Sequence, residues 1–338
     1  MRKFKSICLI LILLVGILAG CSAEASGVNK SGNETVTLRL AHNQGETHPV
    51  HTSLVEFARL VEEKTDGQVK VDLYPNGQLG SEREVIELTQ TGAVDIAKVS
   101  ASALESFSEV YSLFSLPYLF NSKDHFYDVM TSSIAKEIYT TTEDLGFKGL
   151  TFYDSGSRNF YTKDTPINHP DDLKGLKIRV QQSATAIEMI ELMGGSATPM
   201  SFGEVYTALQ QGVIDGSENN ETALTDNNHG EVAKYYSYSE HSIVPDILIM
   251  NNSKFNELDE TYKQAIEEAA EESTLYHKVI WEEAIENAVE IAEEKGVTFN
   301  QLDKTPFIEA VQPQHEEFAK KESTGKYYEQ IQALIPAD

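Results

Sequence analysis

The sequence has only two cysteines in 338 residues, Cys8 and Cys21, and a single tryptophan. Cys8 lies in an N-terminal apolar stretch and Cys21 directly follows it, so the rest of the chain has no thiol. This excludes a disulfide, a thiolate metal site and a cysteine nucleophile in that remainder. The patterns G-x-S-x-G, G-x-x-x-x-G-K-[ST] and G-x-G-x-x-G are also missing, so no hydrolase or nucleotide motif supports an enzyme.

Positive charge is scarce as well. Lys and Arg number 27 against 53 Asp and Glu, which gives a formal net charge of −26. Such a chain is a poor partner for nucleic acid. Many of the acids fall in stretches with helical composition, such as 282–294, which predicts a solvated face. Because the overall field repels anions, binding of an anion would require a local cationic pocket.

The N-terminus has the layout of a secretory signal, with three basic residues among the first five and an apolar run over 7–19. That run is too short to span a membrane stably. Residues 18–21, Leu-Ala-Gly-Cys, resemble a bacterial lipobox, in which the cysteine is acylated after cleavage. We therefore expect a signal peptide over 1–20, a lipidated Cys21 on the extracytoplasmic face of the cell membrane, and a flexible polar tether over 21–34. An uncleaved membrane helix is the alternative.

The body of the chain, from Thr35 onward, carries an α/β pattern. Apolar residues alternate over 36–40 and 69–73, which predicts two strands, and recur at helical spacing over 53–64 between them. A strand, a helix and a strand in succession indicate an α/β lobe. The stretch 258–295 is rich in Glu, Ala and Lys with an apolar stripe, and predicts one or two long helices able to brace two lobes.

Two segments far apart in the chain, 88–96 and 209–216, resemble each other. Each predicts a helix that ends at a glycine, Gly92 or Gly212, in the left-handed conformation, followed by a short apolar strand with an acid. The similarity is too short to prove a duplication. It indicates equivalent positions in two lobes, with polar residues leaving the strand ends, where α/β sheets bind ligands.

Three places combine polar side chains with turns, and the first is 41–51. Its three histidines and one glutamate suggest a metal, but the H-E-x-x-H spacing is missing. Asn43, just past the first strand, is the better candidate for a ligand hydrogen bond. Alternatively, the side chains of this segment only cap a helix.

The other two places contain arginines and asparagines. Arg158 lies beside a glycine turn, and Arg179 sits between apolar neighbours on a predicted strand. The planar guanidinium matches a carboxylate with two parallel hydrogen bonds. An internal salt bridge to one of the many acids is an equally good explanation. Asn219 and Asn220 follow a predicted strand and suit hydroxyl or carboxylate ligands, although Asn-Asn commonly marks a turn.

These residues belong to a longer pattern formed by 172–180, 198–210 and 212–219, in that order, together with 74–80. With it, the chain resembles the solute-binding proteins of tripartite ATP-independent periplasmic (TRAP) transporters, of the dicarboxylate-receptor (DctP) type. The likeness runs from about Val36 to the C-terminus. It implies a periplasmic-binding-protein-like α/β fold, with two lobes, a hinge and a long helix bracing both, that closes on its ligand.

The resemblance also implies roles for particular residues. Arg179 corresponds to the arginine that clamps the ligand carboxylate, and Arg158 to a second cationic contact. Asn219 corresponds to an asparagine that reaches the ligand from the other side, Phe202 to an aromatic wall, and Asn43 to a contact from the first lobe. We expect the first lobe to comprise 35–156 and 245–285, and the second to comprise 157–244 and 286–338.

Lys98 and Ser100 fall in a stretch that varies with the ligand in this family. Sialic-acid receptors resembling this chain carry a glutamate where Ser100 stands, which argues against sialic acid. Gln181 and Gln182 suit hydroxyl recognition better than a bare dicarboxylate requires. The expected ligand-binding residues are therefore Asn43, Lys98, Ser100, Arg158, Arg179, Gln182, Phe202, Asn219 and Asn220.

From the resemblance we expect a monomeric receptor without cofactor, metal or catalysis, which binds a hexuronate-type sugar acid and delivers it to the membrane subunits of a TRAP permease. The alternatives are a C4-dicarboxylate or another monocarboxylate as ligand, and a binding module that serves a sensor kinase. A secreted hydrolase or lyase acting on uronates is a further alternative, which would need a base close to the acidic carbon of the sugar.

Overall fold

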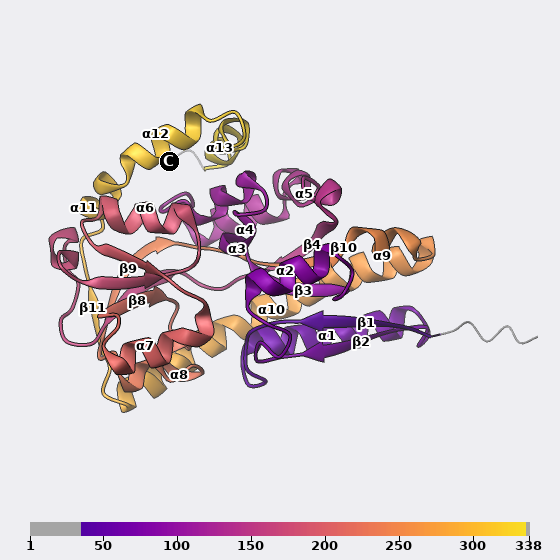
Figure 1. Ribbon diagram of the computed structural model, residues 1–338, viewed down its shortest axis with the longest axis horizontal. Helices are drawn as coiled ribbons and strands as arrows, with labels where there is room; N and C mark the ends of the chain where they lie inside the picture. Colours follow the sequence, from indigo (N-terminus) through magenta and orange to yellow (C-terminus); the bar gives the residue numbers. More distant parts are fainter. Residues whose placement is uncertain (1–34, 336–338) are drawn as a thin grey trace, which may run out of the picture. The chain divides into compact units, whose positions relative to one another are not determined.

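Two β-sheets form the framework of residues 35–335, the part of the chain that the computed structural model describes (Figure 1). The first sheet has the order β2-β1-β3-β10-β4 and the second β11-β9-β5-β8-β6-β7. The strands of the first sheet are β1 Val36–Ala41, β2 Val69–Tyr74, β3 Ile96–Ser100, β4 Phe147–Tyr153 and β10 Asp246–Asn251. Those of the second are β5 Arg158–Thr162, β6 Lys177–Val180, β7 Ser196–Pro199, β8 Gly216–Asn219, β9 Tyr235–Ser242 and β11 Thr298–Gln301. The predicted α/β class and both predicted strands are confirmed.

Helices cover the sheets. They are α1 Pro49–Lys64, α2 Glu82–Gln90, α3 Ala101–Leu104, α4 Lys123–Thr131, α5 Ser133–Thr140, α6 Ala184–Leu192, α7 Val205–Gln211, α8 Thr222–Thr225, α9 Asn252–Glu257, α10 Glu260–Glu294, α11 Thr305–Ala310, α12 Gln312–Lys320 and α13 Gly325–Gln332. The predicted helix over 53–64 is the greater part of α1, and the stretch 258–295 forms one long helix, α10. Among the described residues, none of these helices has the length and apolar character needed to cross a membrane.

Each sheet packs on both faces, because side chains alternate along a strand. In the first sheet, Ile247 and Ile249 of β10 contact the cluster under α2, α4 and α5, while Leu248 and Met250 contact α1 and α10. In the second sheet, Phe160 of β5 packs toward α6 and α11, and the next residue, Tyr161, packs toward α7. Burial on both faces explains why a strand such as β10 contains a continuous apolar run, residues 247–250.

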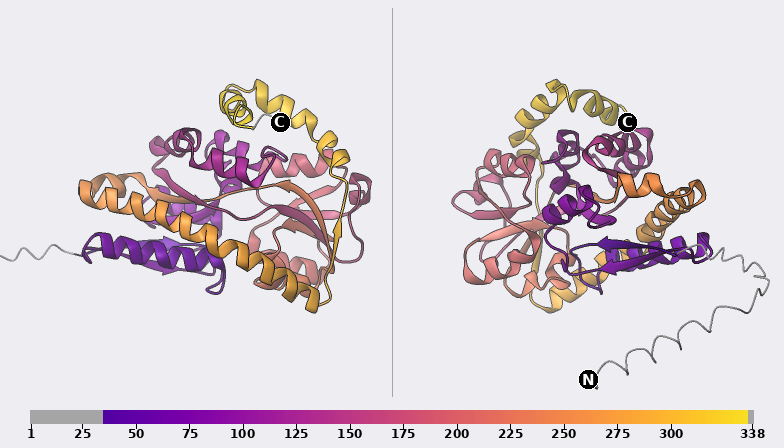
Figure 2. Two further views of the ribbon diagram at one scale, coloured as in Figure 1. Left: turned by 180° about the vertical axis from the view of Figure 1, so that it is seen from behind. Right: turned by 45° about the vertical axis from the view of Figure 1, so that its right-hand side comes forward.

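The long helix α10 runs along both sheets (Figure 2). Its N-terminal half places Ile266 and Ala270 in the core of the first sheet, and Ala292 near its end joins the core of the second. Trp281, between them, is buried and stacks on His277 with ring centroids 5.3 Å apart. The predicted bracing role of this helix is confirmed.

The chain also crosses between the sheets at 154–157 and 243–245. The two crossings are adjacent and are joined by a hydrogen bond from the Ser155 hydroxyl to the carbonyl of Val244. Gly156 has a φ of 69°, and a Cβ there would lie 3.2 Å from the Cβ of Asn220 and 3.3 Å from the ring of Trp281. Glycine is therefore required where the first crossing passes the long helix.

The C-terminal segment, expected within 286–338 of the second lobe, packs against the cores of both sheets. Phe307 and Val311 pack in the core of the second sheet, but Phe318 and Ile331 pack among the helices of the first. His125 of α4 contacts the carbonyl of Ile331 at 2.9 Å, which fixes α13 there. The apolar faces of α12 and α13 thus form another connection between the sheets. The expected lobe boundaries stay predictions.

The two segments that resemble each other in sequence occupy equivalent positions, α2–β3 and α7–β8. Gly92 and Gly212 have φ angles of 74° and 70°. In each segment the acid after the glycine accepts a 2.8 Å hydrogen bond from a backbone N–H of a strand of the same sheet: Asp95 from Arg39, and Asp215 from Lys177. The local equivalence expected from the sequence is confirmed. Cys21 and the expected signal peptide and tether lie outside the described residues.

Candidate functional site

Polar residues at or just after the C-terminal ends of β1, β3, β6 and β8 line a common space between the two sheets, as expected for α/β proteins. It has a small inner cavity of about 40 Å³ and an outer cavity of about 370 Å³. The inner cavity is lined by Asn43, Gln44, His48, Glu82, Lys98, Ser100, Ser155, Arg158, Arg179, Gln181, Phe202, Asn219, Asn220, Asp246 and Trp281. Asn43, Glu82, Arg179, Gln181 and Phe202 also line the outer cavity, which continues the inner one.

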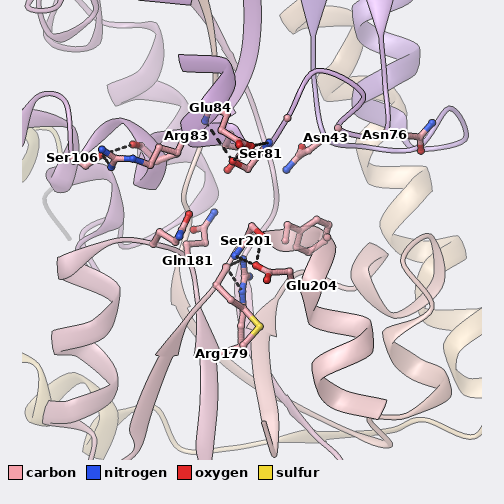
Figure 3. Close-up of a pocket in the computed structure, with 18 residues that line it drawn as sticks. Asn43, Asn76, Ser81, Arg83, Glu84, Ser106, Arg179, Gln181, Ser201 and Glu204 are labelled. Carbon is pink, nitrogen blue, oxygen red and sulfur yellow. Dashed lines mark hydrogen bonds between the residues drawn. The ribbon is translucent and has the colours of Figure 1, made fainter. Parts of the chain in front are cut away.

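The structure brings the predicted ligand-binding residues together. Eight of the nine line the inner cavity, and Gln182 lines the outer cavity beside Arg179. In Figure 3, Arg179 and Gln181 of the second sheet's side lie across the outer cavity from Asn43, Ser81 and Arg83. Residues from 43 to 220 in the sequence thus face one space. Their contacts with a ligand remain predictions.

Among the described residues that line the inner cavity, Arg179 is the cation with a buried donor atom that has no protein partner. Its Nε and Nη2 donate to the carbonyl of Met200 at 3.1 and 2.8 Å, and its guanidinium carbon lies 5.7 Å from the ring centre of Phe202. Its Nη1 is buried, and no atom of residues 35–335 accepts a hydrogen bond from it. Burial lowers the pKa of Arg179, but a guanidinium stays protonated in proteins. A buried, charged donor without a protein partner is costly, and it points to an anionic ligand.

Arg158, expected as a second cationic contact of the ligand, is paired with an acid of the protein. Its Nε pairs with one carboxylate oxygen of Glu218, and its Nη2 donates to the other at 2.8 Å. Nη1 donates to Oδ1 of Asn219 at 3.1 Å. Burial raises the pKa of Glu218, but Arg158 and a hydrogen bond from His241 outweigh burial and hold it at about 2. The internal salt bridge that was the alternative is therefore present, and a contact of Arg158 with a ligand through its remaining Nη1 hydrogen stays a prediction.

Lys98 is also neutralised by a partner. It is 1% exposed, and its Nζ donates to Oδ2 of Asp246 and to Oδ1 of Asn43, both at 3.0 Å. Lys98 on β3 and Glu218 on β8 hold the same place in the two equivalent segments, each paired with a charge on an antiparallel neighbour strand. The two sheets therefore contain similar buried ion pairs with the charges exchanged. The equivalent strand carries the cation in the first sheet and the acid in the second.

Glu82 is a residue of the site that the sequence reasoning missed. It begins α2, its carboxylate accepts from the backbone N–H of Ser100 at 3.0 Å, and it lies 3.8 Å from Lys98. Burial raises the pKa of Glu82. Asp246 was missed too, although an acid heading the wholly apolar run 247–250 was a usable signal. Glu82 has no such signal, because an acid in the first turn of a helix is common.

Amide side chains supply the remaining polar groups. Nε2 of Gln181 donates to the hydroxyl of Ser100 at 2.9 Å, a bond that joins the two sides of the space. Oδ1 of Asn220 accepts from the N–H and hydroxyl of Thr222, so this asparagine caps a turn, while its Nδ2 donates to the carbonyl of Ser155. The turn expected as an alternative for Asn219 and Asn220 is thus present, and both side chains still line the inner cavity.

The histidines of 41–51 have structural partners. His48 is the N-cap of α1, where its Nδ1 accepts from the N–H of Val50, and its Nε2 lies 3.2 Å from the hydroxyl of Thr222. Nε2 of His42 lies 3.1 Å from Nδ1 of His51. Within residues 35–335, no three His, Cys, Asp or Glu side chains are grouped so as to hold a metal ion. Helix capping, the alternative for this segment, is confirmed for His48.

Burial lowers the pKa of five buried histidines in or near this space: His42, His48, His229, His241 and His277. For His42 and His229 the pKa falls to about 3. Below the ordinary value near 6.5, the unfolded chain binds protons that these folded histidines do not. Their contribution to stability is therefore complete above pH 6.5 and is lost as the pH falls below it.

The free energy of unfolding should accordingly decrease between pH 7 and pH 5. Burial raises the pKa of Glu82, Glu221 and Asp226, which favours folding at lower pH. These three acids are outnumbered by the five histidines together with His51 and His315, whose pKa burial also lowers. We expect a loss of about 1.4 kcal/mol per pH unit for each net proton. Urea unfolding at pH 7.5, 6.0 and 5.0 measures it. A stability that stays constant or rises toward pH 5 would contradict the assignment of these histidines as neutral.

Known proteins resemble this chain over nearly all of the described residues. The family model described as "Bacterial extracellular solute-binding protein, family 7" (DctP) matches residues 40–322. The protein YiiZ of Salmonella typhimurium, named as uncharacterized, is 45% identical over 304 residues, which cover 89% of this chain and 92% of that protein.

Two crystal structures of TRAP periplasmic solute-binding proteins share the fold. The protein from Anaerococcus prevotii, with bound α/β-D-glucuronate, is 45% identical with a TM-score of 0.87, over 90% of this chain and all of that one. The protein from Chromohalobacter salexigens, with bound D-glucuronate, is 35% identical with a TM-score of 0.85, over 88% of this chain and 99% of that one. The two-sheet architecture, the buried arginine facing a cavity and these matches lead to one conclusion: the chain belongs to family 7 of the bacterial extracellular solute-binding proteins, the receptors of TRAP transporters.

Proposed function

We propose that this protein binds a hexuronate, such as D-glucuronate, in the space between its sheets and delivers it to the membrane subunits of a TRAP permease. The observation that carries the proposal is the unpaired Nη1 of Arg179, buried at the wall shared by the two cavities. The bound glucuronate of the two similar crystal structures supports the choice of acid.

The binding mechanism involves no chemical reaction. The carboxylate of the sugar acid pairs with the free edge of the Arg179 guanidinium, and Phe202 stacks beside it. Hydroxyls of the sugar exchange hydrogen bonds with Asn43, Gln181 and the carboxylate of Glu82, all of which line both cavities. Closure of the two sides around the ligand excludes water and strengthens these bonds.

The same geometry disfavours a dicarboxylate in the inner cavity. Lys98 and Arg158 are already paired with Asp246 and Glu218, so Arg179 is the cation left to bind a carboxylate among the described residues that line this cavity. A second carboxylate in the inner cavity would meet the acid of Glu82 rather than another available cation, at an energetic cost. Hydroxyl groups, by contrast, can donate to that acid.

Titration calorimetry of the purified protein with D-glucuronate, D-galacturonate, succinate and D-glucose tests this function. We expect micromolar binding of the hexuronates, which corresponds to about −8 kcal/mol. Succinate should bind at least about 100-fold more weakly because of Glu82, and D-glucose, which lacks the carboxylate, should not bind measurably. Equal or tighter binding of succinate would show that the receptor takes C4-dicarboxylates instead.

We further propose that the receptor acts as a monomer and is held at the outer face of the cell membrane by a lipid on Cys21. The lipobox-like segment 18–21 supports this location, and the family consists of extracellular solute-binding proteins. Mass spectrometry of the protein from membranes would detect the acyl groups on Cys21. A receptor held in this way stays close to the permease that it serves.

A further inference from the structure

One carboxylate joins the two sides of the ligand space without lining it. Glu105 follows α3, which continues directly from β3, the strand of Lys98 and Ser100. Across the space, α6 follows β6, the strand of Arg179. Glu105 lines neither the inner nor the outer cavity. Any effect of this residue on affinity must therefore come from the arrangement of the two sides rather than from the ligand.

Glu105 binds the first turn of α6 with both of its oxygens. The hydroxyl of Ser183 donates to Oε2 at 2.5 Å, and the backbone N–H of Thr185 donates to Oε1 at 3.0 Å. Ser183 and Thr185 are both buried. Ser183 is also the N-cap of α6, where its Oγ accepts from the N–H of Ala186 at 3.0 Å. The carboxylate thus completes the capping of this helix from outside, where the helix dipole favours negative charge.

We propose that Glu105 is a clasp that holds the ligand space closed, acting as a positioning residue for ligand retention. Separation of the two sides would break both hydrogen bonds and return the carboxylate to water. The bond between Ser100 and Gln181 spans the same gap, but those two residues line the inner cavity and contribute to the ligand site directly. Glu105 thus favours the closed arrangement regardless of the acid that is bound.

The inference rests on the proposed function, and ligand dissociation rates test it. With D-glucuronate, Glu105→Gln should raise the dissociation rate constant roughly tenfold and leave the association rate constant within about twofold, because the lost bonds form only on closure. The ratio of affinities for D-glucuronate and D-galacturonate should not change. A change confined to the dissociation rate constant separates a clasp from a residue that shapes the ligand site, because the latter would also change this ratio.

Two further variants make the test sharper. Ser183→Ala combined with Glu105→Gln should cost less than the sum of the single changes, because both remove the same bond. The control is Glu109→Gln. Glu109 lies four residues after Glu105 and is exposed, and its carboxylate pairs with Lys321 and Ser323 on its own side of the space. It should keep wild-type rates.

The outcomes separate the two proposals. Wild-type protein that binds D-glucuronate, with an unchanged dissociation rate in Glu105→Gln, would overturn the clasp alone. Wild-type protein that binds succinate but no hexuronate would overturn the proposed ligand, and the same rate comparison made with succinate would decide the clasp. Binding of neither acid would overturn both.

Discussion

Replacing Arg179 by methionine should abolish hexuronate binding and leave the ligand-free protein as stable as the wild type, or more stable. The guanidinium edge facing the cavities can form two charge-assisted hydrogen bonds to a carboxylate, each with a net value of about 1.5–3 kcal/mol. Loss of both predicts a decrease in affinity of roughly 100- to 10,000-fold. Titration calorimetry with D-glucuronate measures this change.

The stability prediction follows from the state of Arg179 without ligand. Its charge is buried and its Nη1 has no acceptor among residues 35–335, so an apolar side chain of similar length removes a desolvation cost. Methionine also retains the contact with Phe202. Thermal unfolding of Arg179→Met without ligand measures the effect. Arg179→Met with wild-type affinity would refute Arg179 as the carboxylate site.

The matched control for this variant is Arg59→Met. Arg59 lies on the exposed face of α1 and pairs with Glu56 and Glu63. Its removal should change neither the affinity nor the free energy of unfolding measurably, as is usual for exposed ion pairs. Arg179→Lys should retain a charge but lose the planar fork, and its affinity should fall between those of the wild type and Arg179→Met.

Replacing Glu218 by glutamine should greatly decrease the free energy of unfolding, whereas Arg179→Met should leave it unchanged or increase it. The change leaves the Arg158 guanidinium buried without its counter-ion, which typically costs about 3–5 kcal/mol. Urea unfolding at pH 7.5 measures it. At that pH the wild-type carboxylate is fully ionised, because its pKa is held at about 2.

A double variant distinguishes the loss of the ion pair from a general disturbance of β8. Arg158→Met with Glu218→Leu replaces both charges by apolar side chains and should recover most of the stability lost by Glu218→Gln. A loss below about 1 kcal/mol in the single variant would show that Arg158 is solvated or paired elsewhere. The sign-exchanged pair Lys98–Asp246 on the first sheet offers a parallel comparison.

In the proposed function, the two buried ion pairs explain how an acidic protein selects a ligand with a single carboxylate. The net charge of −26 repels anions at long range, so the receptor depends on short-range contacts. Of the three cations that line the inner cavity, two are neutralised by carboxylates on neighbouring strands. In the proposed function, the remaining arginine binds the one carboxylate of the ligand, and the surrounding amides and Glu82 are suited to hydroxyls. This arrangement favours a sugar acid over a dicarboxylate.

Much of the fold could be predicted because it depends on local patterns. Alternating apolar residues gave β1 and β2, and the apolar stripe of 258–295 gave the single helix α10. Gly92 and Gly212 marked the two equivalent helix ends. The packing of α12 and α13 against the core of the first sheet could not be predicted, because an amphipathic helix shows which of its faces is buried but not which core buries it.

By itself, the sequence determined the family, the α/β class and the candidates for the site, with Arg179 foremost among them. Only the tertiary structure decided which arginine is available to a ligand. Arg158 and Glu218 are 60 residues apart and become partners because β5 pairs with β8, and Lys98 meets Asp246 because β3 pairs with β10. Such pairings depend on sheet order and register, which local sequence does not encode. From the sequence, either Arg158 or Arg179 could therefore have been the arginine that forms an internal ion pair.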